Sequence, residues 1–419
     1  MEYKKIEEKA YNLHLIKSEK SKKISIKINI KEKINKETVT KRAMLSYILD
    51  EANKIYKTKR LLNIEAQELY LPRINIIQEK IGKFHFLSFI NVFLNEKYTE
   101  EGLNEKTIKF FLNIINEPLV ENQKFDEETF NMVKETTRND INLFNENPNR
   151  QAKQELDNIV LKGTGGEISV VGYVDDLDKI TPENLYQYYK KMIKDNIVDI
   201  FVVGNFEFDE MEKILKENLK FNSIKKKSES HIIEHKKTRK IVKKVVTEKN
   251  IPQSLLIIAS KGINITDFER TYVLSVYNEI LRTNLFKEVR EKNSLCYSIT
   301  SHFSALNSLE LIQAGIDKNN FKKAITLIKK EIKKIEANDF TDELIEQAIL
   351  GYKLALQEIE DSPEDILGLY QDYVYYNVDL VEERIKKIQT VTREDIIKVS
   401  KKIKLDTIYF QKGVKKHED

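Results

Sequence analysis

Cysteine is nearly absent from this sequence: the 419 residues include one, Cys296. That scarcity excludes an internal disulfide and any metal site built from several cysteines, and it agrees with a reducing compartment. Cys296 falls in a strand-like stretch with no obvious histidine partner, so we expect a packed or half-exposed thiol rather than a nucleophile.

Long apolar runs are absent as well. No stretch approaches the ~18 residues that cross a bilayer, and the chain opens Met-Glu-Tyr-Lys-Lys, without the apolar core of a secretory signal. We therefore expect a cytoplasmic protein that has no membrane partner.

A strong excess of one charge is also missing. The net charge of +4 is the small difference between 71 basic and 67 acidic residues, which favours no polyanionic partner. Basic residues crowd one segment, at Lys225–Lys227, Lys236–Lys237, Arg239–Lys240 and Lys243–Lys244. Such a run can bind nucleic acid, but aromatic residues are missing from it, and we prefer a solvated linker with no nucleic-acid partner.

An internal repeat divides the chain. Thr181 begins a helix with proline at its first position, and an apolar strand then leads to Gly204. The same order recurs at Thr392 and Gly413, 211 and 209 residues later. One unit of about half the chain length has therefore been used twice. We predict a first domain at residues 1–222, a charged linker at 223–244 and a second, homologous domain at 245–419.

The apolar periodicity of each copy mixes helices with strands. Alternating isoleucines at 24, 26, 28 and 30 indicate a strand, and residues 74–77, 84–93 and 255–259 indicate others. Helices are predicted at residues 39–49, 61–70, 107–115, 126–144, 319–336, 341–358 and 363–375. The predicted fold class is α+β, with two homologous domains that each pack helices on a mostly antiparallel sheet.

The most informative stretch runs from Leu281 to Ile299 and predicts helix, turn and strand. A capping box at Thr266–Glu269 begins the helical part, in which Glu288 can pair with Lys292 at i+4. Asn293 and Ser294 end the helix, and alternation from Leu295 onward predicts a half-buried strand.

The run Arg290-Glu-Lys-Asn-Ser-Leu-Cys-Tyr297-Ser resembles the Arg-Glu-Lys-x-Gly-Leu-x-Tyr-Ser motif of pitrilysin- and insulinase-like metallopeptidases, the inverzincins. Ser294 replaces the glycine of the family. The resemblance covers nearly the whole chain and implies half of a clamshell, in which Arg290 and Tyr297 reach across a chamber to substrate. The local pattern alone allows another interpretation: Arg290 as a solvated charge, and Tyr297 as a core residue on the face of Leu295 and Ile299.

The zinc motif of that family is missing. Active members carry His-x-x-Glu-His on the first helix, where both imidazoles bind zinc and the glutamate activates water. The segment Arg42–Thr58 resembles that helix in a bacterial subclass without the motif, and its motif positions hold Ala43, Ser46 and Tyr47. The helix predicted at 126–144 keeps Glu135 and Asp140, where the family has a third ligand. We expect no zinc and no other cofactor in this chain.

A literal match to the zinc motif lies elsewhere, at His231-Ile-Ile-Glu-His235. It falls within the basic linker, its flanks lack the apolar face of a helix, and the surrounding positive charge opposes a dication. We interpret it as a chance match that binds no metal. The other histidines, at 14, 85, 302 and 417, show no ligand spacing and are interpreted as strand, loop or tail residues.

Two functions follow from the resemblance. In the first, the chain is the catalytically incomplete subunit of a heterodimeric zinc peptidase, inactive alone, whose sister subunit carries the zinc while Arg290 and Tyr297 position a peptide or unfolded polypeptide. In the second, it is a non-enzymatic scaffold of the same fold, as in elongation factor P modification or peptide maturation. No catalytic residue is assigned to this chain alone under either hypothesis.

Overall fold

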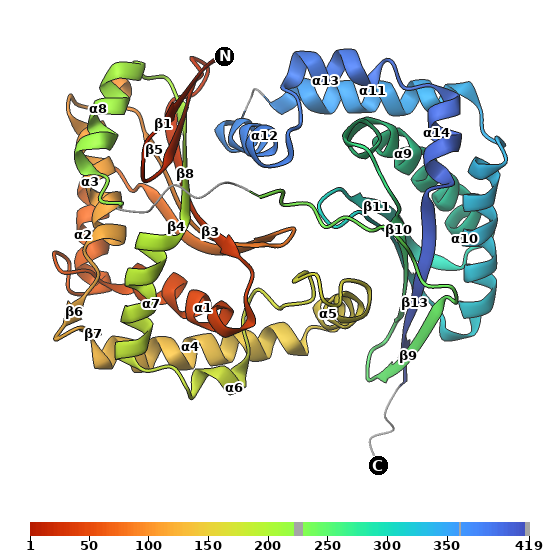
Figure 1. The fold of residues 1–419 in the computed structure, drawn as a ribbon, viewed down its shortest axis with the longest axis horizontal. Coiled ribbons are helices and arrows are strands. Elements are labelled where there is room, and N and C mark those ends of the chain that lie inside the picture. The colour runs from red at the N-terminus through yellow and green to blue at the C-terminus, as the bar shows by residue number, and fades with distance from the viewer. Residues whose placement is uncertain (222–228, 360–361, 415–419) are drawn as a thin grey trace. The chain divides into compact units, whose positions relative to one another are not determined.

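The structure is a computed structural model that describes residues 1–221, 229–359 and 362–414. The described residues gather into two compact units (Figure 1). Unit 1 takes them from Met1–Glu146, Ile168–Ser230 and Ile359–Gln371, and unit 2 from Asn147–Glu167, His231–Glu358 and Asp372–Asp419. The predicted domain boundaries stay predictions, since spatial clustering alone does not define homologous domains. Residues 223–228 of the predicted linker, which include Lys225–Lys227, lie outside the described residues.

Unit 1 contains, within the described residues, a six-stranded sheet in the order β1-β2-β8-β3-β5-β4. Neighbouring strands are antiparallel except β2 and β8, which pair in parallel. The strands are β1 (Glu2–Glu7), β2 (Asn12–Lys17), β3 (Lys23–Lys33), β4 (Arg73–Ile81), β5 (Phe84–Leu94) and β8 (Ile197–Gly204). β3 is the strand that the alternating isoleucines predict, whereas β1 and β2 have no counterpart among the predicted strands.

The helices of unit 1 pack their apolar residues on this sheet, around a core that includes Met44, Phe111 and Leu185. α1 begins after Asn35, and α7 begins after Thr181, as predicted; both cap residues accept a backbone N–H bond. The elements are α1 (Lys36–Glu51), α2 (Lys59–Glu68), η1 (Glu96–Tyr98), α3 (Leu103–Asn116), α4 (Glu127–Glu146), α6 (Val174–Leu177), α7 (Pro182–Asp195) and α8 (Phe208–Asn218), with a short hairpin of β6 (Val120–Glu121) and β7 (Lys124–Phe125).

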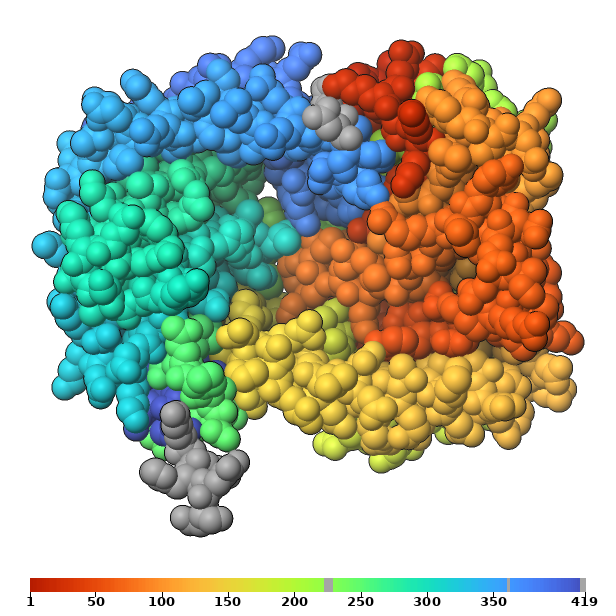
Figure 2. Space-filling view, turned by 180° about the vertical axis from the view of Figure 1, so that it is seen from behind, coloured from red at the N-terminus to blue at the C-terminus, as the bar shows by residue number. Residues whose placement is uncertain are grey.

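α4 is the longest helix of unit 1. Figure 2 shows it, in yellow-orange, at the molecular surface along its length. Nowhere in the described parts of the chain does a helix combine the length and the apolar character needed to span a bilayer.

Unit 2 contains, again among the described residues, a five-stranded sheet in the order β11-β12-β10-β13-β9. Its pairs are antiparallel except β13 and β9, which are parallel. The strands are β9 (Lys243–Lys249), β10 (Ser254–Gly262), β11 (Cys296–Ser304), β12 (Leu309–Ile316) and β13 (Ile403–Gly413). β11 is an edge strand, so one row of its backbone groups faces away from the sheet.

Helices cover both faces of the second sheet (Figure 1). α9, α10 and α14 bury the larger core on one face, and α5 packs on the other. The helical elements are α5 (Pro148–Val160), the π-helical η2 (Glu269–Val273), α9 (Leu274–Leu285), the π-helical η3 (Phe286–Lys292), η4 (Lys318–Asn320), α10 (Phe321–Glu336), α11 (Asp342–Glu358), α12 (Pro363–Tyr376), α13 (Val381–Ile388) and α14 (Arg393–Ser400). α12 begins in unit 1 and ends in unit 2.

The two sheets share one topology, which agrees with the repeat found in the sequence. The order β4-β5-β3-β8-β2 in unit 1 matches β11-β12-β10-β13-β9 in unit 2, including the single parallel pair at the end. The repeated segments that begin at Thr181 and Thr392 form α7–β8 and α14–β13. The predicted α+β class with two homologous halves is confirmed.

The core of unit 2 contains a buried acid, Glu310 on β12. Its carboxylate is fully buried and meets two weak donors, the Ser301 hydroxyl at 3.3 Å and the Tyr277 hydroxyl at 3.4 Å. Burial raises the pKa of Glu310 to about 7. The folded protein therefore binds this proton more tightly than the unfolded chain does, and it loses stability as the pH rises from about 4.5 to about 7.

We predict that Glu310→Gln stabilises the protein at neutral pH, because the amide has no charge to bury. The gain should approach ~3 kcal/mol at pH 8 and largely disappear at pH 4.5, as measured by urea unfolding at both values. Glu346→Gln on the exposed face of α11 is the matched control and should change little at either pH. An equal effect of Glu310→Gln at both values would contradict this prediction.

Candidate functional site

Arg290 and Tyr297 come together in unit 2. Arg290 lies in η3, the π-helical continuation of α9, and Tyr297 lies near the start of β11. The guanidinium carbon of Arg290 is 5.6 Å from the Tyr297 ring centroid and 4.6 Å from that of Phe286. The cation therefore stacks on two aromatic rings, at distances where cation–π attraction acts. Phe286 had not been predicted as a partner, although its place four residues before Arg290 puts both on one helical face.

A bulge turns the Tyr297 side chain outward. Cys296 pairs with Ile316 and Ser298 pairs with Gly315, so Tyr297 is an extra residue in the β11 ladder. Its side chain is 81% exposed. The interpretation of Tyr297 as a core residue is wrong, because one inserted residue shifts the alternation that the sequence pattern assumes.

The turn between η3 and β11 is tight even though serine replaces glycine. Ser294 has φ +50°, in the left-handed region. Its N–H donates to the Arg290 carbonyl at 3.0 Å, and the next N–H, of Leu295, donates to the Val289 carbonyl at 3.1 Å. Val289 and Leu295 are buried, which anchors the turn on both sides. This geometry fixes how far Tyr297 lies from the end of the helix.

The Arg290 guanidinium is held by rings and not by acids. Among the described residues it makes no ion pair and no side-chain hydrogen bond, while the nearby Glu288 pairs with Lys292 as predicted. A guanidinium has five N–H donors and no acceptor, so Arg290 keeps its donors for a carbonyl or an anion. The neighbouring Cys296 is half-buried, and burial raises the pKa of its thiol, which disfavours the nucleophilic thiolate.

The positions of the missing zinc motif lie on α1 in unit 1 and carry no zinc ligands. Ala43 offers no side-chain donor atom. The Ser46 hydroxyl donates to the Ala43 carbonyl at 2.7 Å, and the Tyr47 hydroxyl donates to the Asp140 carboxylate on α4. Burial, together with Asp140, raises the pKa of Tyr47. These side chains do not fit a zinc ion, because none is an imidazole and the two hydroxyls already donate to the Ala43 carbonyl and to Asp140.

The acids on α4 also have partners within the protein. Asp140 receives the Tyr47 hydroxyl, and Glu135 faces Arg138, whose Nε lies 3.5 Å away. Within the described ranges, no group of three or more histidine, cysteine, aspartate or glutamate side chains is placed to hold a metal ion.

The literal match His231-Ile-Ile-Glu-His235 is not helical in the structure. Only on a helix does the spacing of four residues place both imidazoles on one face, so this segment lacks the arrangement that the motif requires. The His231 ring packs 5.0 Å from that of Tyr375, and His235 Nε2 lies 2.8 Å from the Asn307 carbonyl. Burial lowers the pKa of His235.

The expectation of a solvated segment is wrong at these two histidines, which are 2% and 8% exposed. They belong to unit 2, where the His235 backbone bridges Ile263. Lys236, Lys237 and Lys240, which follow them, are exposed as expected.

The remaining histidines agree with their interpretation as structural residues. His14 and His85 are buried in β2 and β5, and burial lowers the pKa of His14 to about 4. His302 is exposed on β11, and His417 lies outside the described residues.

Comparison with known proteins identifies relatives of the same architecture. Residues 179–352 match the family described as "Peptidase M16 inactive domain". The chain is 27% identical over 409 residues to the "Probable inactive metalloprotease YmfF" of Bacillus subtilis, which covers 96% of this chain and 95% of that protein.

Solved structures extend the likeness to the whole fold. A conserved protein from Enterococcus faecalis V583 aligns with a TM-score of 0.90 and 25% identity, over 99% of this chain and 100% of that one. The periplasmic protease PqqL from Escherichia coli aligns with a TM-score of 0.71 and 13% identity; 97% of this chain matches only 45% of PqqL. This chain therefore has the fold of about half of that longer protease.

We predict that Ser294→Gly stabilises the protein by about 1 kcal/mol. A non-glycine residue in the left-handed region destabilises the folded state by about 1–2 kcal/mol, and glycine removes this strain. Part of the gain is cancelled, because glycine has more conformational freedom in the unfolded chain. Thermal unfolding measures the change. Asn338→Gly is the control, because Asn338 has φ +63° but asparagine tolerates that conformation, so little gain is expected. Destabilisation by Ser294→Gly would count against the strain inferred at this turn.

We predict that Tyr47→Phe destabilises the protein by about 1–2 kcal/mol, because it leaves the half-buried Asp140 carboxylate without its donor. Chemical denaturation measures the loss. Tyr98→Phe removes a hydroxyl from a residue that is 49% exposed and should have no measurable effect. If both variants behaved alike, the Tyr47–Asp140 contact would have no role in holding α1 against α4.

Proposed function

The chain belongs to the M16 metallopeptidase family, among the members that lack the zinc motif, and from this premise we propose that it is the substrate-positioning subunit of a two-chain zinc peptidase. A sister chain with an intact His-x-x-Glu-His motif would complete the enzyme. The proposal extends what is established, which is that the chain is a homologue of inactive M16-type metalloproteases.

The observation that carries the proposal is the Arg290–Tyr297 pair. If Arg290 formed a buried ion pair, or if Tyr297 were packed in the core, their hydrogen-bond donors would not be available to a ligand. Instead, the phenol is exposed, the guanidinium stacks on its ring, and no described acid neutralises the cation. Because the bulge and the left-handed turn hold the pair in place, little ordering is needed when substrate arrives.

The chemistry of the pair suits a peptide carbonyl. In an M16 peptidase the zinc ion, here assigned to the sister chain, polarises the scissile carbonyl and activates water. The Tyr297 hydroxyl can donate one hydrogen bond to a substrate oxygen, and Arg290 can donate more while adding positive charge. Donors aimed at an oxygen that gains negative charge lower the barrier of the reaction.

The length relation to PqqL supports a two-chain assembly. The fold of this chain corresponds to 45% of that protease, so a second chain of similar size would supply the remainder. The alternative remains a non-enzymatic scaffold that holds a peptide or protein, as in elongation factor P modification or peptide maturation. The two proposals differ in whether a zinc-bearing sister chain makes the complex a peptidase.

The test is to co-express the chain with such a sister chain and to measure zinc-dependent cleavage of an unfolded peptide. We expect either chain alone to be inactive. Arg290→Ala and Tyr297→Phe should each lower kcat/KM of the two-chain complex by about tenfold to a hundredfold. Each substitution removes hydrogen-bond donors from the substrate oxygen that gains negative charge. Tyr297→Phe keeps the ring on which Arg290 stacks, so it separates the hydroxyl from the stacking.

Arg282→Ala is the matched control. Arg282 lies on α9, is exposed and pairs with Glu279 at 2.6 Å, so its loss should leave turnover unchanged. If the two-chain complex kept full activity with both Arg290 and Tyr297 replaced, the role assigned to these residues would be wrong. A stable complex without any cleavage would favour the scaffold.

A further inference from the structure

Unit 2 contains a cavity of about 500 Å³ that is separate from the Arg290–Tyr297 pair. Its size lies within the range of roughly 300–1,000 Å³ that is common for small-molecule sites. Sixteen residues of unit 2 line it. They come from the segment before β9, from η2, α9 and α11, from the end of β11 with the turn that follows, and from the stretch between the end of α12 and α13.

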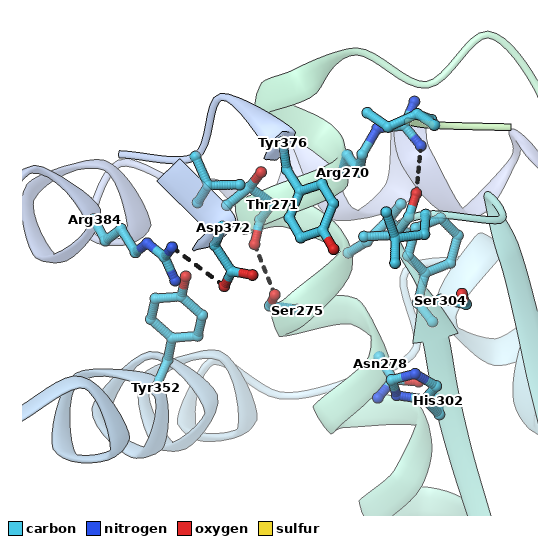
Figure 3. A pocket seen from close by; sticks show the side chains of 16 residues that line it. Arg270, Thr271, Ser275, Asn278, His302, Ser304, Tyr352, Asp372, Tyr376 and Arg384 are labelled. Carbon is cyan, nitrogen blue, oxygen red and sulfur yellow. Dashed lines mark hydrogen bonds and ion pairs between the residues drawn. The ribbon is translucent and has the colours of Figure 1, made fainter. Parts of the chain in front are cut away.

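The lining combines apolar and polar side chains. Leu274, Phe303 and Leu306 contribute apolar surface. Figure 3 shows Ser275 and Asn278 on one helix, with Arg270 on one side of the view and the Asp372–Arg384 pair on the other. A cavity that combines apolar surface with placed polar groups suits an organic ligand, because the polar groups can fix its orientation.

Arg270 is the charged group of this lining that lacks a counter-charge. Its side chain donates to the Ala305 carbonyl at 2.9 Å, to the Ser308 hydroxyl at 2.5 Å and to the Ile265 carbonyl at 3.2 Å. All three acceptors are neutral, and Nε has no hydrogen-bond partner among the described residues. The residue is 6% exposed, so this positive charge is held almost out of solvent.

No described acid neutralises Arg270. Burial lowers the pKa of Arg270, while Asp267 and Glu234 oppose this from a distance; both acids are exposed, and neither forms an ion pair with it. An arginine nevertheless stays charged at any physiological pH. A buried charge without a partner is costly, and an arriving anion would offset that cost.

Unit 1 has the same architecture and contains a buried arginine, Arg42, whose charge is neutralised by an acid. Arg42 lies on α1, the helix that follows β3, and is fully buried. It donates to the Ile30 and His85 carbonyls at 2.9 and 3.1 Å, much as Arg270 donates to backbone carbonyls in unit 2. Arg42, however, has Glu32 at 3.3 Å as a counter-ion. The contrast shows that this fold can place an acid beside a buried arginine, although none lies beside Arg270.

The other charges of the cavity cancel. Asp372 and Arg384 face each other at 3.4 Å, and Arg384 Nε also donates to the Asp379 carbonyl at 2.5 Å. Burial raises the pKa of Asp372, with Arg384 acting against it. The cavity therefore keeps one uncompensated positive charge, that of Arg270, beside apolar walls.

We propose that this cavity binds a ligand that carries a carboxylate on a small apolar body, with the carboxylate facing Arg270. A guanidinium matches a carboxylate in both charge and planar geometry. Two sources share this chemistry: the C-terminus of a peptide and a free carboxylic acid. Neither Arg290 nor Tyr297 lines the cavity, so the site is distinct from the pair assigned to substrate positioning.

The experiment is isothermal titration calorimetry on the chain alone, so that its result does not depend on pairing with a sister subunit. The probes are an N-acetylated dipeptide of two apolar residues with a free C-terminal carboxylate, the same dipeptide as its amide, 3-phenylpropionate and inorganic phosphate. We expect the free acid to bind at least about tenfold more tightly than the amide, because only the acid offers a charge to Arg270.

Two variants locate the binding. Ser275→Phe places a ring in the cavity and should weaken acid binding at least about tenfold. Thr283→Phe is its control: it makes a similar change at an exposed position of α9 that does not line the cavity, and it should bind as the unchanged chain does. Arg270→Gln should reduce the acid to the affinity of the amide; circular dichroism checks its folding, and if it fails to fold, Ser275→Phe decides.

Each outcome has a defined meaning. Binding of 3-phenylpropionate as tight as that of the dipeptide acid supports the proposal with a free acid as the ligand, and binding of the dipeptide acid alone supports it with a peptide C-terminus. Equal affinity for acid and amide, unchanged binding in Ser275→Phe, or competition by phosphate as strong as that by the acid would overturn it.

Discussion

Each unit is organised around a strand that is hydrogen-bonded on both sides and buried over most of its length. β3 and β10 hold these places. A buried strand must have its backbone groups paired by neighbours, so the order of each sheet follows outward from it. β4 and β11 then fall at corresponding edges, and the helix that follows the central strand, α1 or η2–α9, packs against the sheet. Both the face of α1 that carries Ser46 and Tyr47 and the Arg290–Tyr297 pair take their positions from this constraint.

The repeat and the α+β class could be predicted because their signals are local. A capped helix followed by an apolar strand is written twice in the chain, at Thr181 and at Thr392, and both copies fold as predicted. β2 is different: its partner β8 lies nearly two hundred residues away, and no short pattern reports such pairing. β1 is a charged edge strand whose apolar content is too low to predict it.

The candidate site was predicted in part. The motif placed Arg290 at the end of a helix and Tyr297 after a turn, and the structure brings them together. The local pattern alone did not predict the exposure of Tyr297, because a bulge leaves no trace in a period of two. The burial of His231 and His235 depends on partners distant in sequence, and so does the isolation of Arg270. From the sequence, an arginine on a helix is expected to be exposed to solvent. Only the tertiary structure shows that Arg270 is buried and that no described acid forms an ion pair with it.

The bulge at Tyr297 also affects how β11 meets other chains. An edge strand with polar, uncharged residues such as Ser298 and Thr300 invites a strand from another molecule to extend the sheet. An incoming strand could follow β11 only as far as the extra residue, where the hydrogen-bond ladder loses its register. The inserted residue that exposes the Tyr297 phenol thus also interrupts regular strand pairing at the start of β11.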